Sequence, residues 1–330
     1  MMRIQGEKIL VTGAGGFVGS HLVEHLVAHG CDVRCFVRYT SRNDKGLLGD
    51  LDKRVLDSVE IVAGDLRDPE AVRNAALGTH VIFHLGALIA IPYSYRNPGE
   101  VAETNVMGTL NVLQAARVCD IPRIVHTSTS EVYGTARMAP MPETHPLQAQ
   151  SPYAASKIGA DKLAESFHLS YGLPVTTIRP YNIFGPRQSE RAVTPTIVNQ
   201  ALYRDVIRLG ALSPTRDLTF VKDTVRAFRM LAECDEAVGG VFNVGTGTEV
   251  SIGDLATLVL ELVGSNAPIV TDEERLRPET SEVFRLIADS SRAREVFGWT
   301  PDYTLRDGLL ETIAWFREHP ERYGGGKYLV

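Results

Sequence analysis

Short apolar runs alternate with longer helical patterns along residues 1–180, and this alternation limits the chain to few folds. The runs are almost continuously apolar, as in strands of a parallel sheet that helices cover on both faces. Between the runs, apolar side chains recur at helical spacing. We therefore predict an α/β fold with a doubly wound parallel sheet. The expected strands are residues 8–12, 32–37, 59–63, 80–85, 123–128 and 175–179, and the expected helices are residues 17–29, 69–76, 99–119 and 152–171.

The regular alternation ends at Pro180, beyond which prolines separate shorter elements. Strand-like runs at 218–221 and 241–244 can return to the main sheet or belong to a neighbouring one. We predict one domain over residues 1–180, rejoined by about 217–245, and a smaller C-terminal α/β region over residues 181–330. This region is expected to cover the ligand edge of the sheet and to contain helices at 252–263, 290–297 and 305–318.

Composition limits the partners and the compartment. Lys plus Arg is 34 against 40 Asp plus Glu, a net charge of −6, whereas nucleic-acid binders usually carry a basic excess. The apolar stretch 81–91 is interrupted by His84 and is far shorter than the ~20 residues of a membrane span. No signal-peptide core precedes the first strand. We expect a cytoplasmic protein that binds neither nucleic acid nor membranes.

The cysteines and histidines do not form a metal-ligand pattern. No C-x-x-C pair occurs among Cys31, Cys35, Cys119 and Cys234, so buried reduced thiols are expected. His84 and His126 fall in strand-like runs and are interpreted as interior side chains. We predict no metal site.

A glycine turn, G-x-x-G-x-x-G, joins the first expected strand to the first expected helix. Gly13 permits the tight turn, Gly16 lets backbone amides approach a pyrophosphate, and Gly19 lets the helix pack closely on the strand. The pyrophosphate then lies at the positive helix N-terminus, beside Phe17 and Val18. We predict that residues 1–180 form a Rossmann-type NAD(P)-binding domain.

The ends of the next strands supply further cofactor contacts. Arg38 ends the second strand, where its guanidinium can hold the 2′-phosphate of NADP or stack on the adenine, so NAD and NADP both remain open. Asp65 ends the third strand and is placed to accept from the adenine amino group. Leu66, Leu85 and Ala87 are predicted to complete the cofactor contacts.

Tyr153 and Lys157 lie at i and i+4 near the start of an expected helix, so they share one face. A free tyrosine has a pKa near 10, but a neighbouring lysine and a nicotinamide cation both favour the phenolate. Thr129, at the end of the fifth strand, offers a hydroxyl that can share the substrate proton. We predict Tyr153 as the base, Lys157 as its partner and cofactor ligand, and Thr129 as both a catalytic and a substrate-binding residue.

With these motifs the chain resembles an extended short-chain dehydrogenase/reductase of the nucleotide-sugar epimerase/dehydratase family. Members of this family oxidise the C4 hydroxyl of the sugar with a tightly bound, recycled NAD(P)+ and then differ in the fate of the 4-keto intermediate. The resemblance implies that residues 181–330 mainly bind a nucleotide-diphosphate sugar. Its landmarks here are the glycine turn, Phe83–Ala87, Thr104-Asn105, Thr129, Tyr153, Lys157 and Arg179–Pro186.

Glu131 follows Thr129 by two residues and distinguishes the branches of the family. Turned inward, it can take the C5 proton of a 4-ketohexose, after which water is lost from C6 and hydride returns there. Many family dehydratases have Asp-Glu after the threonine; this chain has Ser130-Glu131, like the GDP-mannose 4,6-dehydratase type. Glu131 itself or a water is then the candidate acid for the leaving hydroxyl.

The same Thr-Ser-Glu occurs in family decarboxylases that act on UDP-glucuronate. The surrounding sequence, including residues 87–95 and 151–161, resembles bacterial 4,6-dehydratases of legionaminic-acid-type pathways, which act on nucleotide-linked N-acetylhexosamines. We predict a lyase of deoxysugar biosynthesis that makes an NDP-4-keto-6-deoxyhexose. The alternatives are an NDP-sugar 4-epimerase, a UDP-glucuronate decarboxylase and a catalytically silent NAD(P)-binding regulator.

The family landmarks also indicate substrate contacts. Asn182 is expected to bind the sugar-side phosphates, and Arg216 and Arg277 to supply charge for the diphosphate. Arg187 is a further candidate, and Ser94 is expected to contact the sugar or the nicotinamide side, or only to pack its loop.

The helical patterns at 99–119 and 152–171 resemble the pair that forms a four-helix dimer bundle in this family. We therefore expect a homodimer. Leu163 and Phe167 can serve either the dimer contact or the core of one subunit.

Overall fold

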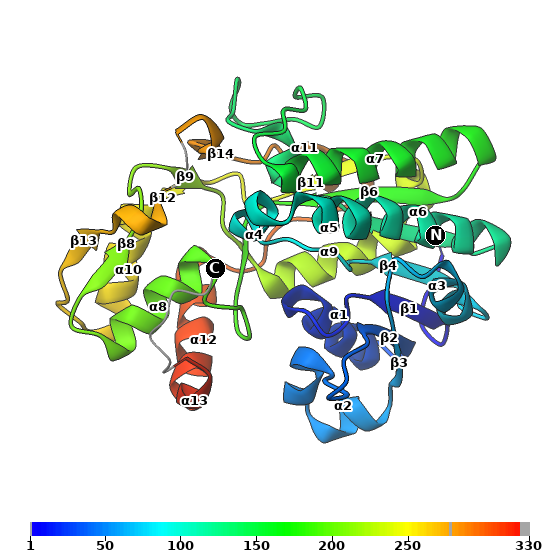
Figure 1. Cartoon of the computed structure of the whole chain (residues 1–330), viewed down its shortest axis with the longest axis horizontal. Helices are drawn as coiled ribbons and strands as arrows, with labels where there is room; N and C mark the ends of the chain where they lie inside the picture. The colour runs from blue at the N-terminus through cyan, green and yellow to red at the C-terminus, as the bar shows by residue number, and fades with distance from the viewer. Residues whose placement is uncertain (1, 277–278, 324–330) are drawn as a thin grey trace.

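A seven-stranded parallel sheet forms the centre of the structure, a computed structural model that describes residues 2–276 and 279–323 (Figure 1). The strand order is β11-β6-β5-β4-β1-β2-β3, and every neighbouring pair is parallel. The six strands predicted within residues 1–180 are confirmed. The seven strands are β1 (Lys8–Thr12), β2 (Asp32–Arg38), β3 (Glu60–Gly64), β4 (Val81–His84), β5 (Arg123–Thr127), β6 (Val175–Pro180) and β11 (Val241–Val244).

The order of the strands reverses at β1, which lies between β2 and β4. In an open parallel sheet such a reversal leaves a crevice outside the carboxyl ends of the strands, where ligands bind. Thr12, at the end of β1, is paired with Phe36 on one side and His84 on the other. The predicted doubly wound, Rossmann-type fold is therefore confirmed, and its switch point is at the glycine turn.

Helices cover both faces of the sheet because successive strand residues alternate between two apolar cores. On one face α1 (Phe17–Ala28) packs against α9 (Val221–Glu233), and Ile9 and Val11 of β1 belong to their core. On the other face α6 (Gly108–Val118) lies between α3 (Pro69–Ala76) and α7 (Pro152–Tyr171), and Leu10 of β1 belongs to that core. Phe167 is buried in this second core and Leu163 is half-buried against it, so both side chains contribute to the core of one subunit.

Capping residues explain where the main helices begin. Asp68 accepts hydrogen bonds from the amides of Glu70 and Ala71 at the start of α3, and Ser151 accepts from the amide of Ala154 at the start of α7. The helix expected over 99–119 is divided. It consists of α5 (Pro98–Ala102), a π-helical stretch η2 (Glu103–Met107) and α6.

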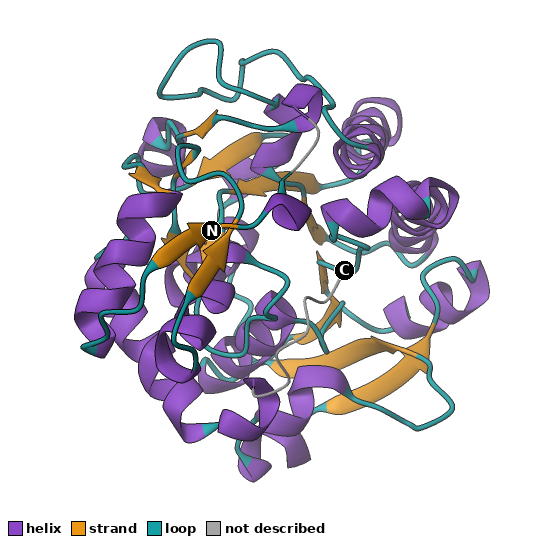
Figure 2. Cartoon of the chain, turned by 60° about the vertical axis from the view of Figure 1, so that its left-hand side comes forward, coloured by secondary structure: helices purple, strands orange, loops and turns teal. Residues whose placement is uncertain are grey.

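The smaller region contains three short sheets, with strand orders β10-β7, β12-β9-β14 and β13-β8 (Figure 2). The run 218–221 does not form a strand of the main sheet: β10 (Thr219–Phe220) pairs with β7 (Ile183–Phe184), and α9 begins at Val221. The run 241–244 does return to the main sheet, beside β6. The other strands are β8 (Ile207–Leu209), β9 (Thr215–Arg216), β12 (Val250–Ser251), β13 (Ile269–Thr271) and β14 (Arg285–Leu286).

Two of the helices expected in this region, α10 (Ile252–Val263) and α12 (Leu305–Glu318), have the predicted bounds, and α11 (Ser291–Phe297) begins one residue later than predicted. The sequence analysis missed α8 (Val193–Tyr203) and α9. The remaining helical segments are η1 (Gly46–Asp50), α2 (Lys53–Asp57), α4 (Ile91–Arg96), η3 (Ser130–Tyr133), η4 (Asp235–Ala237), η5 (Glu273–Arg275), η6 (Glu279–Ser281) and α13 (Pro320–Tyr323).

All four cysteines are free thiols; Cys119 is half-buried and the other three are buried. Burial raises the pKa of the Cys35 thiol to about 12, which makes it unreactive at neutral pH. Among the described helices, none combines the length and the apolar character needed to cross a membrane.

Candidate active site

A cavity of about 570 Å³ opens at the switch point, outside the carboxyl ends of β1 to β6. This volume lies in the range of small-molecule and cofactor sites. The cavity brings most of the predicted cofactor and catalytic residues together. Its lining includes Gly13, Gly16, Phe17, Val18, Gly19, Arg38, Asp65, Leu66, Leu85, Ala87, Thr129, Glu131, Tyr153 and Asn182.

The glycine turn has no room for side chains. A Cβ on Gly13, which has a φ of +70°, would lie 2.7 Å from the amide nitrogen of Gly86, and a Cβ on Gly19 would lie 2.1 Å from the carbonyl oxygen of Gly13. Gly16 caps α1 without a side-chain hydrogen bond, so backbone amides face the cavity at the helix N-terminus. The turn therefore fits a dinucleotide pyrophosphate.

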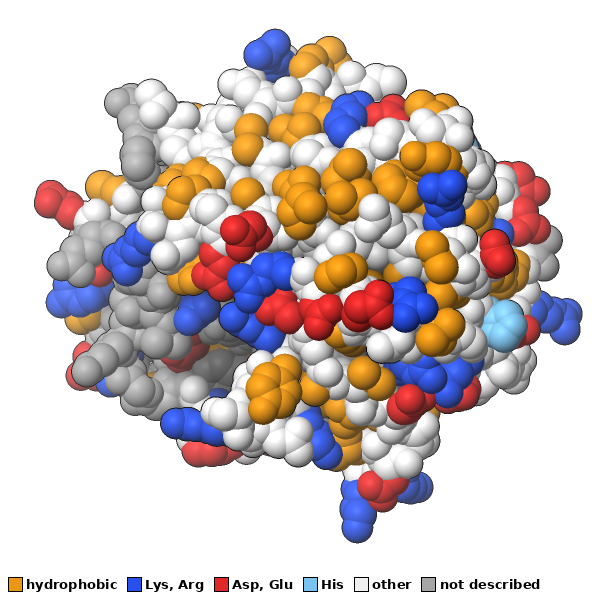
Figure 3. Space-filling model, turned by 45° about the vertical axis from the view of Figure 1, so that its right-hand side comes forward, with side chains coloured by type: hydrophobic (Ala, Val, Ile, Leu, Met, Phe, Trp, Pro, Cys, Tyr) orange, Lys and Arg blue, Asp and Glu red, His pale blue; other side chains and the backbone are white. Residues whose placement is uncertain are grey.

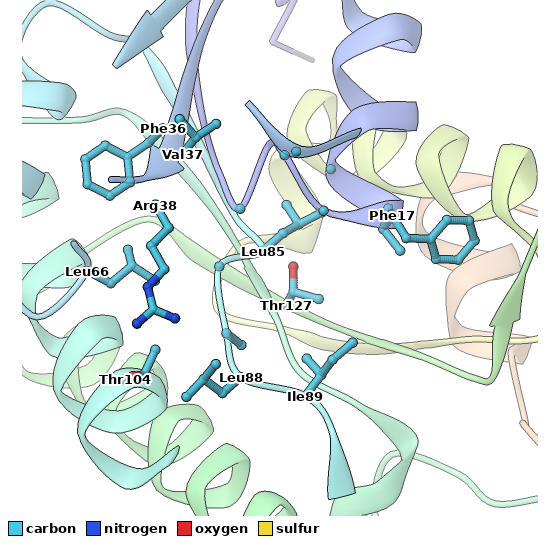
Figure 4. Close-up of a pocket in the computed structure, with 18 of the residues that line it drawn as sticks. Phe17, Phe36, Val37, Arg38, Leu66, Leu85, Leu88, Ile89, Thr104 and Thr127 are labelled. Carbon is cyan, nitrogen blue, oxygen red and sulfur yellow. The ribbon is translucent and has the colours of Figure 1, made fainter. Parts of the chain in front are cut away.

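Both residues expected at the adenosine end are ion-paired. Asp65 accepts from the Arg67 guanidinium at 2.6 Å, and these hydrogen bonds hold the pKa of the carboxyl below its usual range. Arg38 extends from β2 past Leu66 towards Thr104 (Figure 4). Its Nη2 lies 3.7 Å from Oε1 of Glu100. The sequence analysis missed Arg67, whose position two residues after Asp65 was the available signal.

The loop after β2 is a second part of the cavity that the sequence analysis missed. Thr40, Asp44, Lys45 and Gly46 line it. The loop packs on the glycine turn: the amide of Leu47 donates to the carbonyl oxygen of Gly15 at 2.9 Å, and a Cβ on Gly46 would lie 2.4 Å from that oxygen. The sequence Asp-Lys-Gly at 44–46 was its signal.

The catalytic candidates meet at the end of β5. The Thr129 hydroxyl accepts from the amide of Glu131 at 3.2 Å and is hydrogen-bonded to the Tyr153 phenol. Glu131 lines the same cavity, and its negative charge acts on Tyr153. The Thr129 hydroxyl thus contacts both the predicted base and the backbone amide of Glu131.

The protonation of Tyr153 differs from the sequence-based expectation. Burial raises the pKa of Tyr153 well above its usual value, and the charge of Glu131 acts in the same direction. The Nζ of Lys157 donates to the carbonyl oxygen of Thr127 at 2.6 Å. Burial lowers the pKa of Lys157 itself to about 8. Lys157 thus lies behind Thr127, which lines the cavity.

The predicted substrate residues separate into two groups. Asn182 lines the cavity, and its buried Oδ1 has no hydrogen-bond partner among the described residues. Ser94 is buried within α4 and donates to the carbonyl oxygen of Ile91 at 2.7 Å. Arg187 is buried against α1, where it pairs with Glu24 at 2.7 Å. The side chains of Ser94 and Arg187 are therefore engaged within the fold.

The remaining two candidates belong to the smaller region. Arg216 lies on β9, 6% exposed, and its guanidinium contacts the carbonyl oxygen of Thr215 and the carboxylate of Glu282. Arg277 lies outside the described residues.

The two interior histidines are hydrogen-bonded as expected. His84 contacts the hydroxyls of Thr12 and Thr109, and His126 contacts Asp161. Burial lowers the pKa of both imidazoles, which are therefore neutral. Within the described ranges, no group of three or more His, Cys, Asp or Glu side chains is arranged to hold a metal ion.

Comparison with known proteins places this site in a family. The model of the GDP-mannose 4,6 dehydratase family matches residues 10–312. A UDP-glucose 4-epimerase of Mycolicibacterium smegmatis is 37% identical, with 94% of this chain and 98% of the relative covered. A dTDP-glucose 4,6-dehydratase of an Actinoplanes species is 33% identical, again covering 94% and 98%.

Solved structures agree with the sequence relatives. The dTDP-glucose 4,6-dehydratase of Streptomyces venezuelae, with NAD and TYD bound, has a TM-score of 0.85 and 29% identity, covering 96% of this chain and 98% of that one. The family match spans the main sheet, the cavity and the smaller region. The chain therefore belongs to the GDP-mannose 4,6 dehydratase family, an NAD(P)-dependent group of nucleotide-sugar dehydratases and epimerases with a Rossmann-type fold.

Proposed function

We propose that this enzyme is a nucleotide-sugar 4,6-dehydratase that converts an NDP-hexose into an NDP-4-keto-6-deoxyhexose. The observation that carries this proposal is the position of Glu131, which lines the cavity beside Thr129 and Tyr153. Oxidation at C4 requires only a base and a hydroxyl relay. A carboxylate in the same cavity as the base adds a group that can remove the C5 proton.

The first part of the reaction is removal of the proton from the C4 hydroxyl. When bound, NAD(P)+ accepts hydride from C4 and later returns it to C6, and its positive charge favours the phenolate of Tyr153. Tyr153 takes the hydroxyl proton, and Thr129 holds the substrate oxygen by a hydrogen bond. The glycine turn, Arg38 and Asp65 would hold the cofactor in this site.

The second part is elimination of water. The 4-keto group acidifies the C5 proton, which Glu131 removes as the C6–O bond breaks. Glu131 can pass this proton to the departing C6 hydroxyl, which leaves as water; a water molecule is the alternative donor. Ser130 is buried and carries no acidic proton that can serve this step. Return of hydride to C6 and uptake of one proton at C5 from solvent complete the product, and Tyr153 releases to solvent the proton that it took from the C4 hydroxyl, so the protons balance.

The smaller region is proposed to bind the nucleotide. Asn182 lines the cavity, where its side-chain NH2 group can donate a hydrogen bond to the sugar-side phosphates, and Arg216 and Arg277 supply positive charge for the diphosphate. The resemblance to legionaminic-acid-type dehydratases makes an NDP-N-acetylhexosamine the first substrate to test. Ser94, Arg187 and Arg216 are each bonded within the fold, so a ligand would have to displace these contacts to bind any of the three side chains.

A 4-epimerase is the second candidate, because the 37% identical relative carries that name. An epimerase uses Thr129 and Tyr153 in the same way but returns hydride to the opposite face of C4. It has no step that requires Glu131.

The deciding experiment is mass spectrometry of the products formed from UDP-, GDP- and dTDP-hexoses and N-acetylhexosamines. A dehydratase gives a product lighter by one water with no net consumption of cofactor. An NDP-sugar of unchanged mass with inverted C4 would establish the epimerase, and carbon dioxide from UDP-glucuronate the decarboxylase.

The variant Glu131→Gln separates the two parts of the reaction. We expect dehydration to fall about 1,000-fold, a loss of the size seen for general acid–base groups, while reduced cofactor still forms on adding substrate. Glu165→Gln, an exposed carboxylate on α7 paired with Lys162, is the matched control. Full dehydratase activity of Glu131→Gln would contradict the proposal.

A homodimer is proposed for the assembly. Apolar side chains gather on the side of the molecule where α6 and α7 lie (Figure 3). Val118, Leu169 and Tyr171, at or near the ends of these helices, are each more than half exposed. Burial of such side chains in a partner is the usual reason for an exposed apolar patch. Light scattering of the purified protein measures the subunit number.

A further inference from the structure

Asp161 is a buried carboxylate that the mechanism above does not use. It lies on α7 one turn beyond Lys157 and two turns beyond Tyr153, on the same face of the helix. Its side chain is only 4% exposed. A charge at such depth requires compensation by charged or hydrogen-bonding partners.

The partners of Asp161 come from two neighbouring strands. Oδ2 accepts from Ser128 Oγ at 2.7 Å and from Arg179 Nη2 and Nε at 2.9 and 3.2 Å. Oδ1 lies 3.1 Å from His126 Nε2. His126 and Ser128 flank Thr127 at the end of β5, and Arg179 lies near the end of β6. The carboxylate thus ties the catalytic helix to both strands.

Two ties to α7 lie directly before the residue that carries the catalytic hydroxyl, Thr129. Lys157 binds the carbonyl oxygen of Thr127, and Asp161 binds the hydroxyl of Ser128, the residue before Thr129. The strand end that presents Thr129 is therefore held to α7 at two successive residues.

The turn that carries Glu131 is held by the same network. Arg179 Nη1 donates to the Tyr133 hydroxyl at 2.9 Å, and this hydroxyl donates to Asn243 Oδ1 at 2.7 Å. Tyr133 ends the η3 turn, in which Glu131 is the second residue. Loss of Asp161 would release Arg179 and, through Arg179, this turn.

Asp161 also balances buried positive charge. The titratable and charged groups around Lys157 include Tyr153 and Asp161 on its own helix, the neutral His84 and His126 on β4 and β5, and Arg179 on β6, which is bound to Asp161. Burial lowers the pKa of Lys157, and the charge of Asp161 opposes that shift. Without Asp161 the ammonium of Lys157 and the guanidinium of Arg179 would be buried cations without this counter-charge.

We propose that Asp161 is a positioning residue of the site, which aligns Thr129 with Tyr153 through Ser128 and supplies the fixed negative charge for Lys157. The alignment part rests on the proposed function, because it concerns oxidation of a nucleotide sugar. The charge part is independent of the substrate.

The charge part is tested by NMR titration of the holoenzyme labelled with ¹³Cε-lysine. The chain has seven lysines, and the resonance missing in Lys157→Arg identifies Lys157. We expect Lys157 to titrate near pH 8 in the wild type and at least one pH unit lower in Asp161→Asn. Asp223→Asn, a buried aspartate on α9 outside the cavity, is the matched control and should leave the titration of Lys157 unchanged. An unshifted Lys157 in Asp161→Asn would overturn this part.

The alignment part is tested by the rate at which bound cofactor is reduced on adding substrate. We expect Asp161→Asn to lower this rate about 100-fold with KM changed less than threefold, and Asp161→Glu to restore part of it. Ser128→Ala keeps the charge and removes one hydrogen bond; it should lower the rate about tenfold and leave the titration of Lys157 unchanged. A wild-type rate in Ser128→Ala would overturn the alignment. A wild type that reduces no cofactor with any nucleotide sugar would instead refute the proposed function, while the titration still decides the charge part.

Discussion

Each of the two regions contains a buried aspartate that accepts four hydrogen bonds, but the donors differ in kind. Asp161 lies in the region of the main sheet and the cavity, here called the cofactor region, and is bound by an arginine, a histidine and a serine. Asp217, in the smaller region, is bound by the hydroxyl and amide of Thr246 and by the amides of Gly247 and Ala288. The first is held by charge and side chains, and the second by neutral groups, three of them backbone amides.

This difference follows from how each region is built. Long strands of the main sheet place charged side chains at fixed points along β5 and β6, where one helix can collect them. The strands of the smaller region have only two or three residues and provide no such rows. Instead, the carboxylate of Asp217 accepts hydrogen bonds from backbone amides of two other loops, including those of Gly247 and Ala288. We infer that the cofactor region is built for the chemistry and the smaller region for binding. The predictions below test this division.

Among the changes that compare the two regions, the largest effect, a loss of cofactor affinity, is expected at the glycine turn. In Gly19→Ala the new Cβ would lie 2.1 Å from the carbonyl oxygen of Gly13, so the backbone of the turn must move. Overpacking of this kind costs up to a few kcal/mol, and we expect cofactor affinity to fall about 100-fold. Nicotinamide released from purified protein and a fluorescence titration with NADH measure this loss.

The matched control for this change is Gly253→Ala in helix α10 of the smaller region. There the nearest atom to the new Cβ is 3.6 Å away, an ordinary contact. Cofactor content should remain at the wild-type level. A similar loss in both variants would mean that cofactor binding depends equally on the two regions.

A smaller effect is expected from Arg216→Ala. If Arg216 binds the diphosphate, loss of its charge-assisted hydrogen bonds costs about 1.5–3 kcal/mol, which is a rise in KM of about 10- to 100-fold. We expect kcat within threefold of the wild type and unchanged cofactor content. The control is Arg285→Ala. Arg285 lies on the neighbouring strand β14, and the change removes its exposed ion pair with Glu249. A loss of kcat at constant KM would contradict the division of the two regions.

Local patterns in the sequence were sufficient for most of the main sheet. Alternating apolar runs predicted the six strands within residues 1–180, and capping residues such as Ser151 agree with the start of α7. The run 218–221 was ambiguous because its apolar residues suit a strand of the main sheet and a strand of a neighbouring sheet equally well. Its last residue begins α9, which packs on α1, almost 200 positions away in the sequence.

Residue type and spacing were sufficient to predict several residues that line the cavity. Gly13, Tyr153 and Glu131 all line the cavity. The partners of Arg187 and Arg38 were not predictable, because these ion pairs join distant positions: Arg187 to Glu24, and Arg38 to Glu100. Asp161 stands four residues after Lys157 in the sequence, but its role is visible only once β5 and β6 lie against α7.

The smallest effect is expected in the response of the two regions to acid. Burial alone would raise the pKa of Asp161, but the hydrogen bond from His126 and the charge of Arg179 lower it to about 2. A carboxyl whose pKa is lowered on folding contributes stability above its usual pKa, and this contribution is lost as the pH falls from about 4 to 2. The shift corresponds to about 2 kcal/mol. Asp217 behaves in the opposite way: burial raises its pKa, so its contribution is present in acid and is lost as the pH rises.

Acid protonates Asp217 first, because its pKa is the higher of the two, but this removes a buried charge and costs no stability, whereas protonation of Asp161 withdraws stability from the cofactor region. Hydrogen exchange between pH 4 and pH 2.5, corrected for the intrinsic rate, should show amides of β5, β6 and α7 losing protection while those of Gly247 and Ala288 keep theirs. In Asp161→Asn the cofactor region should be less stable at neutral pH and lose its dependence on pH below 4, whereas Asp223→Asn should keep that dependence. Equal loss of protection in both regions would show that the charged network around Asp161 does not set the acid limit of the fold.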